Sequence, residues 1–329
     1  MKSLIDKFNR KINYLRVSVT DRCNLRCVYC TPIEGVLKIS HEEILRYEEI
    51  LRVVEVAVKK GISKVRVTGG EPLVRKGVVN FIRFLSKIHG VQDLSLTTNG
   101  ILLRDFATAL FDAGLRRINV SIDSLNRLKF KEITGGGDLK RVWEGTEEAM
   151  RSGLSPVKIN TVIIKGVNDD EVIDFARLSM DNPYHIRFIE LMPIGSNSQW
   201  NEDRYVSSEE VKKKIESFKR LCPINKKEGG GPARMFRFEG APGKIGFISP
   251  FSDHFCSSCN RLRLTADGKL RSCLFSDKEV DLKSSLRETS DNSSLERLID
   301  FAISNKAERH FLGEKSPKKC SRNMSAIGG

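Results

Sequence analysis

Two short stretches of the chain each hold three cysteines at spacings that suit metal binding. The stretch TDRCNLRCVYC has the pattern C-x3-C-x2-C, formed by Cys23, Cys27 and Cys30. The stretch CSSCNRLRLTADGKLRSC has the pattern C-x2-C-x13-C, formed by Cys256, Cys259 and Cys273. A structural zinc site is closed by four ligands, so each set is one ligand short. Three thiolates can instead hold three irons of a four-iron cluster and leave the fourth iron open to a small molecule.

The same residues allow other interpretations of each set. A zinc site could take its fourth ligand from elsewhere, and for the second set the candidate is His254. The remaining two cysteines, Cys222 and Cys320, are expected to be single thiols without a metal role. In a cytosolic chain, cysteines are more often ligands than partners in disulfides.

The chain carries a large excess of positive charge, which must meet an anionic partner. Its 329 residues include 56 Lys and Arg against 42 Asp and Glu, a formal net charge of +14. Nucleic acid and a polyphosphate would both fit this charge. Aromatic residues make up 7% and are mostly scattered Phe, which gives no platform for stacking bases. We therefore expect a small anionic ligand and no nucleic acid.

The composition, 40% hydrophobic and 30% charged, is that of a globular protein. No apolar run of about 18 residues is present, so no membrane partner is expected. The N-terminal stretch MKSLIDKFNRKINYL has scattered charges and lacks the apolar segment of a signal peptide. A cytoplasmic protein is expected.

Short β-branched runs alternate with helical patterns along the first part of the chain. Strands are expected at 15–19, 64–68, 93–98, 116–122, 157–163 and 185–191. Helices are expected at 41–60, 77–88, 104–113, 140–152 and 169–180. Such tandem units predict a parallel α/β sheet with right-handed crossovers. Six units are too few for an eight-fold barrel, so we predict a partial (βα)6 barrel with an open side, whose site lies at the carboxyl ends of the strands.

The pattern changes after residue 192. A charged helix is expected at 207–219, strands at 234–239 and 244–248, a hairpin turn at 266–268, and helices near 281–288 and 293–304. We predict two domains, a partial barrel over 1–192 and an α+β extension over 193–329. The extension would carry the second cysteine set and the basic C-terminal tail.

The first cysteine loop, with Tyr29 inside it, resembles the loop that defines the radical S-adenosylmethionine (SAM) superfamily. TGGEP, residues 68–72, follows the second strand and is similar to that superfamily's motif for the methionine amino group. The resemblance implies that the open iron chelates the amine and carboxylate of SAM. It also implies that one electron from the cluster cleaves SAM to a 5′-deoxyadenosyl radical. The cofactor carries the difficult chemistry and the protein positions it.

A longer series of segments is similar, in order, to the GTP 3′,8-cyclase family, which opens molybdenum cofactor biosynthesis. The segments are LRVSVTDRCNLRCVYC, VRVTGGEPL, LTTNG, VSIDSL, VKINTV, RFIELMPIG with Trp200 downstream, CSSCNRLRLTADGKLRSCLF and MSAIGG. They cover residues 12–275 and the last few residues, whereas 276–320 match loosely. Leu25 and Thr31 depart from the family's usual residues, but neither is at a ligand position.

This resemblance implies two [4Fe-4S] clusters, SAM as cofactor and GTP as substrate. The radical would take the 3′-hydrogen of GTP, and C3′ would then bond to C8 of guanine. The implied product is (8S)-3′,8-cyclo-7,8-dihydroguanosine 5′-triphosphate. The implied partners are a cyclic pyranopterin monophosphate synthase that consumes the product, a reductant of the ferredoxin or flavodoxin type, and a second copy of the chain in a homodimer.

The resemblance also carries over residue by residue. SAM would be held by Tyr29, Gly70, Ser121 and Met192. GTP would be held by Arg16, Lys64, Arg66, Thr97, Lys158, Arg187, Arg261 and Arg263. These cations stand inside otherwise apolar strands, where a triphosphate needs several converging positive groups. The alternatives are solvated surface charges and, for Met192, simple core packing.

Four residues are expected to act in catalysis: Arg261, Arg263, Gly328 and Gly329. The family inserts its two terminal glycines into the active site, where only residues without side chains would fit. On composition alone, the tail AERHFLGEKSPKKCSRNMSAIGG is typical of a frayed basic end.

Two other functions remain to be separated from a cyclase. One is a different radical SAM enzyme with an auxiliary cluster, such as a peptide maturase. The other is a basic, zinc-bound nucleic-acid module. The terminal Gly-Gly and the Arg261/Arg263 pair favour the cyclase.

Overall fold

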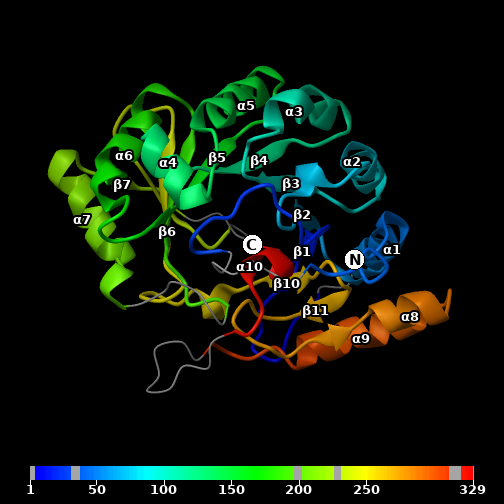
Figure 1. Cartoon of the computed structure of the whole chain (residues 1–329). Helices are drawn as coiled ribbons and strands as arrows, with labels where there is room; N and C mark the ends of the chain where they lie inside the picture. The colour runs from blue at the N-terminus through cyan, green and yellow to red at the C-terminus, as the bar shows by residue number, and fades with distance from the viewer. Residues whose placement is uncertain (1–3, 31–37, 196–201, 226–230, 311–319, 329) are drawn as a thin grey trace.

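The computed structural model describes residues 4–30, 38–195, 202–225, 231–310 and 320–328. Its centre is a curved sheet with helices packed around the outside, and the C-terminal end lies inside the curve (Figure 1). The strand order is β12-β11-β10-β1-β2-β3-β4-β5-β6-β9-β8-β7.

The first six strands run parallel in chain order, which confirms the predicted partial barrel. They are β1 (Tyr14–Ser18), β2 (Lys64–Thr68), β3 (Asp93–Thr98), β4 (Arg117–Ser121), β5 (Val157–Ile163) and β6 (His185–Glu190). The helices between them are α1 (Tyr47–Lys60), α2 (Val78–Lys87), α3 (Leu103–Asp112), α4 (Arg127–Thr134), α5 (Leu139–Arg151) and α6 (Val172–Asp181). Short 3-10 turns, Pro72–Val74 and Asp169–Glu171, precede α2 and α6.

One expected helix begins later than predicted, and one observed helix was not predicted. The helix predicted from residue 41 begins at Tyr47, because Glu49 accepts a hydrogen bond from the backbone N–H of Arg46 and caps the helix there. Helix α4 was not predicted, since it is short and buries few apolar side chains. Its start is set by Asn126, whose side chain accepts from the backbone N–H groups of Leu128 and Lys129.

The chain after β6 extends both edges of this sheet. Strand β9 (Lys244–Ile248) pairs parallel with β6, and β10 (Arg261–Leu264) pairs parallel with β1. The outer strands are antiparallel: β7 (Cys222–Pro223), β8 (Arg234–Arg237), β11 (Lys269–Arg271) and β12 (Val280–Asp281). The β10–β11 hairpin confirms the turn predicted at 266–268. The later helices are α7 (Ser208–Phe218), α8 (Lys283–Glu288), α9 (Ser293–Ser304) and α10 (Met324–Ile327), with 3-10 turns at Glu202–Arg204 and Cys256–Ser258.

Alternation along the strands separates an apolar outer face from a polar inner face. In β2, Val65 and Val67 are fully buried in the hydrophobic core, while the intervening residues face inward. The same core includes Phe247 of β9 and Leu264 of β10, so one core spans the residues on both sides of position 192. Within the described ranges, no helix is long and apolar enough to cross a membrane.

Candidate active site

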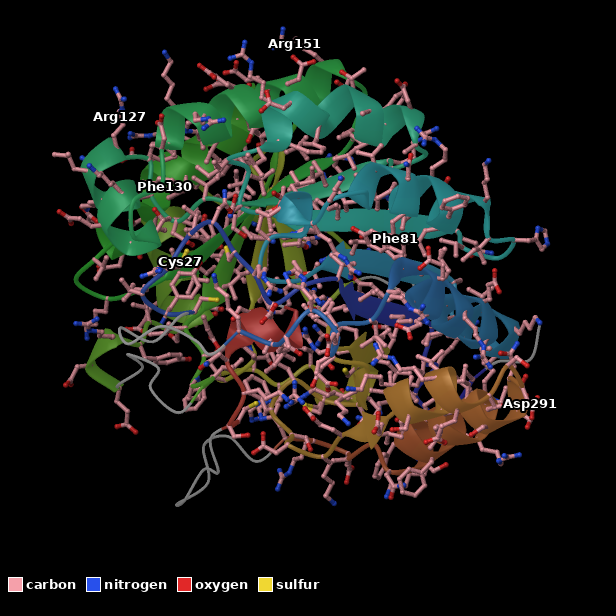
Figure 2. The ribbon with its side chains drawn as sticks, turned by 45° about the vertical axis from the view of Figure 1, so that its right-hand side comes forward. Cys27, Phe81, Arg127, Phe130, Arg151 and Asp291 are labelled. Carbon is pink, nitrogen blue, oxygen red and sulfur yellow. The ribbon has the colours of Figure 1, made fainter. Side chains whose placement is uncertain are left out.

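A cavity of about 390 Å³ opens inside the curved sheet. It is lined by both cysteine sets and by every described residue expected to hold SAM or GTP: Cys23, Cys27, Cys30, Cys256, Cys259, Cys273, Tyr29, Gly70, Ser121, Met192, Arg16, Lys64, Arg66, Thr97, Lys158, Arg187, Arg261 and Arg263. In Figure 2, Cys27 lies on the inner side of the sheet, whereas Arg127 and Arg151 project from the helices at the periphery. Residues far apart in the sequence therefore meet in one chamber.

Strand register explains why so many cations meet there. Arg16 of β1 is in register with Arg66 of β2 on one side and with Arg263 of β10 on the other. Residues two apart on a strand share a face, so neighbouring strands place these guanidinium groups on the same wall. Lys158 of β5 is on the same inner face, and Arg187 of β6 is in register with Asn160 of β5.

The crowding of these cations shifts their protonation equilibria. Burial, with help from Arg187 and Arg66, lowers the pKa of Lys158 to about 6. Burial lowers the pKa of Arg16 to about 9 and that of Arg187 to about 10, in both cases with a contribution from Arg66. The protonated form of each group is thus disfavoured by burial and by neighbouring like charges, and a bound polyanion would favour it again.

Several polar atoms in this wall are buried and have no hydrogen-bond partner within the described part of the chain. They are the Nε atoms of Arg16 and Arg187, the hydroxyl of Thr97 and the side-chain oxygen of Asn160. Leaving such groups unsatisfied is costly, which favours a ligand that supplies hydrogen-bonding atoms. Thr97 is one of the expected GTP residues, whereas Asn160 was missed. Asn160 is two residues after Lys158 on the same strand, so the two side chains share a face. This spacing could have identified Asn160 from the sequence.

The first cysteine loop is held against the end of β2 by the backbone. The N–H of Gly70 donates to the carbonyl of Thr20 at 2.7 Å, and the N–H of Glu71 donates to that of Arg22 at 2.8 Å. A Cβ atom on Gly70 would lie 2.4 Å from the Arg22 carbonyl oxygen, so only glycine allows this approach. Burial raises the pKa of Cys27, and the neighbouring Asp123, Cys30 and Cys23 add to the effect.

The second cysteine set stands among positive charges. Arg261 lies 3.9 Å from the sulfur of Cys259, and the buried Lys306 donates to the carbonyls of Arg261 and Ser272. Burial alone would raise the pKa of Cys259, but Arg261 and Lys306 outweigh it and lower that pKa to about 6. Thiolates held by fixed positive charge suit metal or cluster binding.

The donor sets fit iron–sulfur clusters better than zinc. All eight cysteines are within the described residues, and none forms a disulfide. No group of three or more Cys, His, Asp or Glu side chains in the described ranges could hold a single metal ion. His254 bonds to the carbonyl of Pro250 at 3.0 Å and packs on His310, so it does not complete a zinc site in this arrangement. In a four-iron cluster each thiolate ligates a different iron, so the three sulfurs of a set stand farther apart than the ligands of a single ion.

The residues expected to hold SAM are spread around the same loop. The hydroxyl of Tyr29 donates to Asp123 at 2.6 Å. Burial raises the pKa of Asp123 to about 6. Sequence reasoning missed Asp123, although it directly follows a strand within the VSIDSL segment. Met192 lines the cavity and also packs against Ile194 and Ile327, so it does contribute to packing.

The C-terminal tail enters the chamber and is not frayed at Gly328. Arg263 donates to the carbonyl of Gly328 at 2.8 Å. Gly328 has a φ of +78°, and a Cβ atom there would lie 2.9 Å from both Ser18 and Thr68. Gly329 and Trp200 lie outside the described residues. Gly328, which directly follows α10, therefore lies against the carboxyl ends of β1 and β2, and Figure 1 shows α10 inside the curve of the sheet.

The other two cysteines lie away from the cavity lining. Cys222 is in β7 at the far edge of the sheet. Cys320 is buried at the start of the described tail.

Fold and site define the class of this protein. Residues 17–179 match the model of the radical SAM superfamily, and residues 184–312 match the molybdenum cofactor synthesis C model. Solved structures agree on the fold: Streptococcus suis SuiB superposes with a TM-score of 0.60 at 13% identity, covering 91% of this chain and 68% of that one.

Curated relatives narrow the class to a family. A GTP 3′,8-cyclase of Alkaliphilus metalliredigens is 52% identical over 324 residues, 98% of this chain and 99% of the relative. The GTP 3′,8-cyclase of Pelotomaculum thermopropionicum is 52% identical and covers 98% of this chain and 99% of its own length. The GTP 3′,8-cyclase of Clostridium botulinum is 48% identical and covers 99% of this chain and 100% of its own length. The chain belongs to the GTP 3′,8-cyclase family, as the sequence segments predicted. A zinc-bound nucleic-acid module is the wrong class.

Proposed function

We propose that this protein is a GTP 3′,8-cyclase that converts GTP to (8S)-3′,8-cyclo-7,8-dihydroguanosine 5′-triphosphate. One observation carries the proposal beyond family membership. A single cavity is lined by two three-cysteine sets and by a wall of buried cations with unsatisfied hydrogen-bonding atoms. A peptide substrate would not need this concentration of buried positive charge, whereas a nucleoside triphosphate would.

In this proposal, the first cysteine set holds three irons of one [4Fe-4S] cluster, and the second set holds three irons of another. Tyr29, Gly70, Ser121 and Met192, which line the same cavity, would hold SAM. When bound, the first cluster and SAM supply the one-electron chemistry that abstracts hydrogen. The chain's own contribution is to exclude water, to hold the ribose within reach and to keep the cluster loop fixed against β2.

The cationic wall would bind the triphosphate of GTP through Arg16, Lys64, Arg66, Lys158 and Arg187, with Thr97 as a neutral partner. Arg261 and Arg263, next to the second cysteine set, would face the guanine ring. Fixed positive charge there stabilises negative charge that develops on the purine during reduction. The carbonyl of Gly328 accepts from Arg263, which orients this guanidinium group. A catalytic role for Gly329 is proposed from the family resemblance alone.

Further proposals follow from the same function. The product would pass to a cyclic pyranopterin monophosphate synthase, and a ferredoxin or flavodoxin would supply electrons. Eight cysteines without a disulfide fit a reducing, cytoplasmic location. The division into 1–192 and 193–329 is a proposal; the C-terminal family match begins slightly earlier, at residue 184, and one hydrophobic core joins the two parts. A homodimer is proposed from the family resemblance.

The test is anaerobic reconstitution with iron and sulfide, followed by GTP, SAM and dithionite. We expect about eight irons per chain and the cyclised nucleotide by mass spectrometry. A matched reaction replaces GTP with ATP, which shares the triphosphate but lacks the guanine-specific contacts. SAM cleavage that GTP does not stimulate, or equal product from ATP, would contradict the proposal.

A further inference from the structure

The described tail is fixed to the body of the protein by a network of partly buried charges. Arg322 donates to both carboxylate oxygens of Asp267, at 3.0 and 2.9 Å, and to Glu279 at 2.7 Å. Glu279 also accepts from Arg271 at 2.5 Å. The side chain of Arg271 is fully buried, and those of the other three are 16–24% exposed.

A second set of contacts fixes the start of this tail to the opposite part of the sheet. Cys320 forms a parallel β-bridge with Ile194, just after β6, and its carbonyl accepts from the N–H of Gly195 at 3.1 Å. The sulfur of Cys320 also lies 3.2 Å from Arg271 of β11. Strands β6 and β11 are separated by β10 and β1–β5 in the sheet order, so the tail joins distant parts of the open barrel.

The distance along the chain from this anchor to the site is short. Arg322 precedes α10, and Gly328 follows that helix directly. Because α10 is a single helical turn, the position of Arg322 sets where Gly328 lies relative to Arg263. The bidentate Arg322–Asp267 contact is suited to this, since a planar guanidinium on a carboxylate fixes orientation as well as distance.

We infer that Arg322, held by Asp267 and Glu279, is the positioning residue that fastens the C-terminal tail across the open side of the barrel and places Gly328 at Arg263. Burial opposes ionisation of Asp267, but its bonds to Arg322 and Thr265 lower its pKa, which agrees with a charged pair. The predicted effect on turnover rests on the proposed function. The predicted effect of Arg322 on the position of the tail does not depend on that function.

The experiment compares Arg322→Gln and Arg322→Lys in the full-length, reconstituted protein. Asp267→Asn is a second variant that removes the same contact from the other side. Arg297→Gln is the matched control, because Arg297 is an exposed arginine on α9 whose side chain donates to the hydroxyl of Ser293 on the same helix. Hydrogen–deuterium exchange of the peptide that contains residues 320–328 reports tail docking, iron content reports the clusters, and kcat and KM report turnover.

We expect Arg322→Gln and Asp267→Asn to lose exchange protection of the tail with iron content unchanged. Misplacing a group in the site by about 1 Å can cost about 100-fold in rate, so we expect kcat to fall by about that factor with the KM for SAM unchanged. Arg322→Lys keeps the positive charge but loses the planar guanidinium that contacts both oxygens of Asp267. Its tail protection and its kcat should both be intermediate.

Wild-type tail protection and wild-type kcat in both variants would overturn the inference, and so would a loss of protection without a fall in kcat. Loss of cluster iron in both variants would also overturn it, because the network would then support the fold as a whole. A wild-type protein without cyclase activity would defeat the proposed function, while the exchange measurement would still test whether Arg322 docks the tail.

Discussion

Lys158 gives the sharpest quantitative prediction, because GTP binding should make it take up a proton. With a pKa of about 6, only about 3% of Lys158 is protonated at pH 7.5 in the free protein. A triphosphate beside it would favour the ammonium form and raise this pKa by several units. Binding at pH 7.5 should therefore take up about one proton per GTP.

The protonation states of the other groups around Lys158 change little when GTP binds at pH 7.5. Arg187 and Arg66 flank it from β6 and β2, Arg117 and Asp93 act on it from β4 and β3, and His185 is its partner in register. The pKa of Arg187 is about 10, so it stays charged, and burial lowers that of His185 to about 3, so it stays neutral. A terminal phosphate with a second pKa of about 6 is almost fully ionised at pH 7.5.

The sign of the pH dependence follows from this uptake. Because the complex binds more protons than the free protein between the two pKa values of Lys158, affinity for GTP falls as pH rises. If the pKa in the complex is about 9 or higher, the dissociation constant should be roughly eightfold to tenfold larger at pH 8 than at pH 7. Lys158→Met should remove this dependence and, by losing a charged hydrogen bond worth about 1.5–3 kcal/mol, weaken binding about 10- to 100-fold at pH 7.

Calorimetry of GTP binding in HEPES and in Tris separates proton uptake from binding, because the two buffers differ in ionisation enthalpy. Reconstituted wild type should take up about one proton and Lys158→Met close to none. Lys140→Met, on the exposed face of α5, should behave as the wild type. No uptake in the wild type, or undiminished uptake in Lys158→Met, would refute the reasoning.

Three further substitutions test separate parts of the site. Gly70→Ala should displace the first cysteine loop, because its Cβ would meet the Arg22 carbonyl at 2.4 Å, and iron content should fall by about half, since one of two clusters is lost. Lys306→Met removes the donor from two partly buried carbonyls, at a cost of about 1–3 kcal/mol each, so the melting temperature and the iron of the second cluster should both fall. Gly328→Ala adds a Cβ at 2.9 Å from Thr68 at a positive φ; kcat should fall while iron content stays constant, and unchanged kcat would count against a role for the tail.

Sequence alone predicted the elements whose pattern is local. Strands β2, β3, β5 and β9 were predicted with their observed bounds, because β-branched alternation ends at clear turn residues. The addition of β9 and β10 to opposite edges of one parallel sheet was not predicted. It depends on pairing between strands about 250 residues apart, such as β1 with β10, which no local pattern reports.

The site was predicted in a similar way. Charged residues inside apolar strands indicated the cationic wall, and the two cysteine patterns indicated the cluster loops. Asn160 and Asp123 were missed, although both stand beside predicted residues. Lys306 and Arg322 could not be found, since each acts on residues that lie in other parts of the chain and looks like an ordinary surface cation in the sequence.

The most direct test of the central claim is to follow hydrogen from the substrate. GTP carrying deuterium at C3′ is supplied to the reconstituted protein with SAM and dithionite, and the 5′-deoxyadenosine formed is analysed by mass spectrometry. The account predicts one deuterium in the 5′-deoxyadenosine, together with the cyclised nucleotide in matching amount. Unlabelled 5′-deoxyadenosine, or 5′-deoxyadenosine formed equally well without GTP, would contradict it.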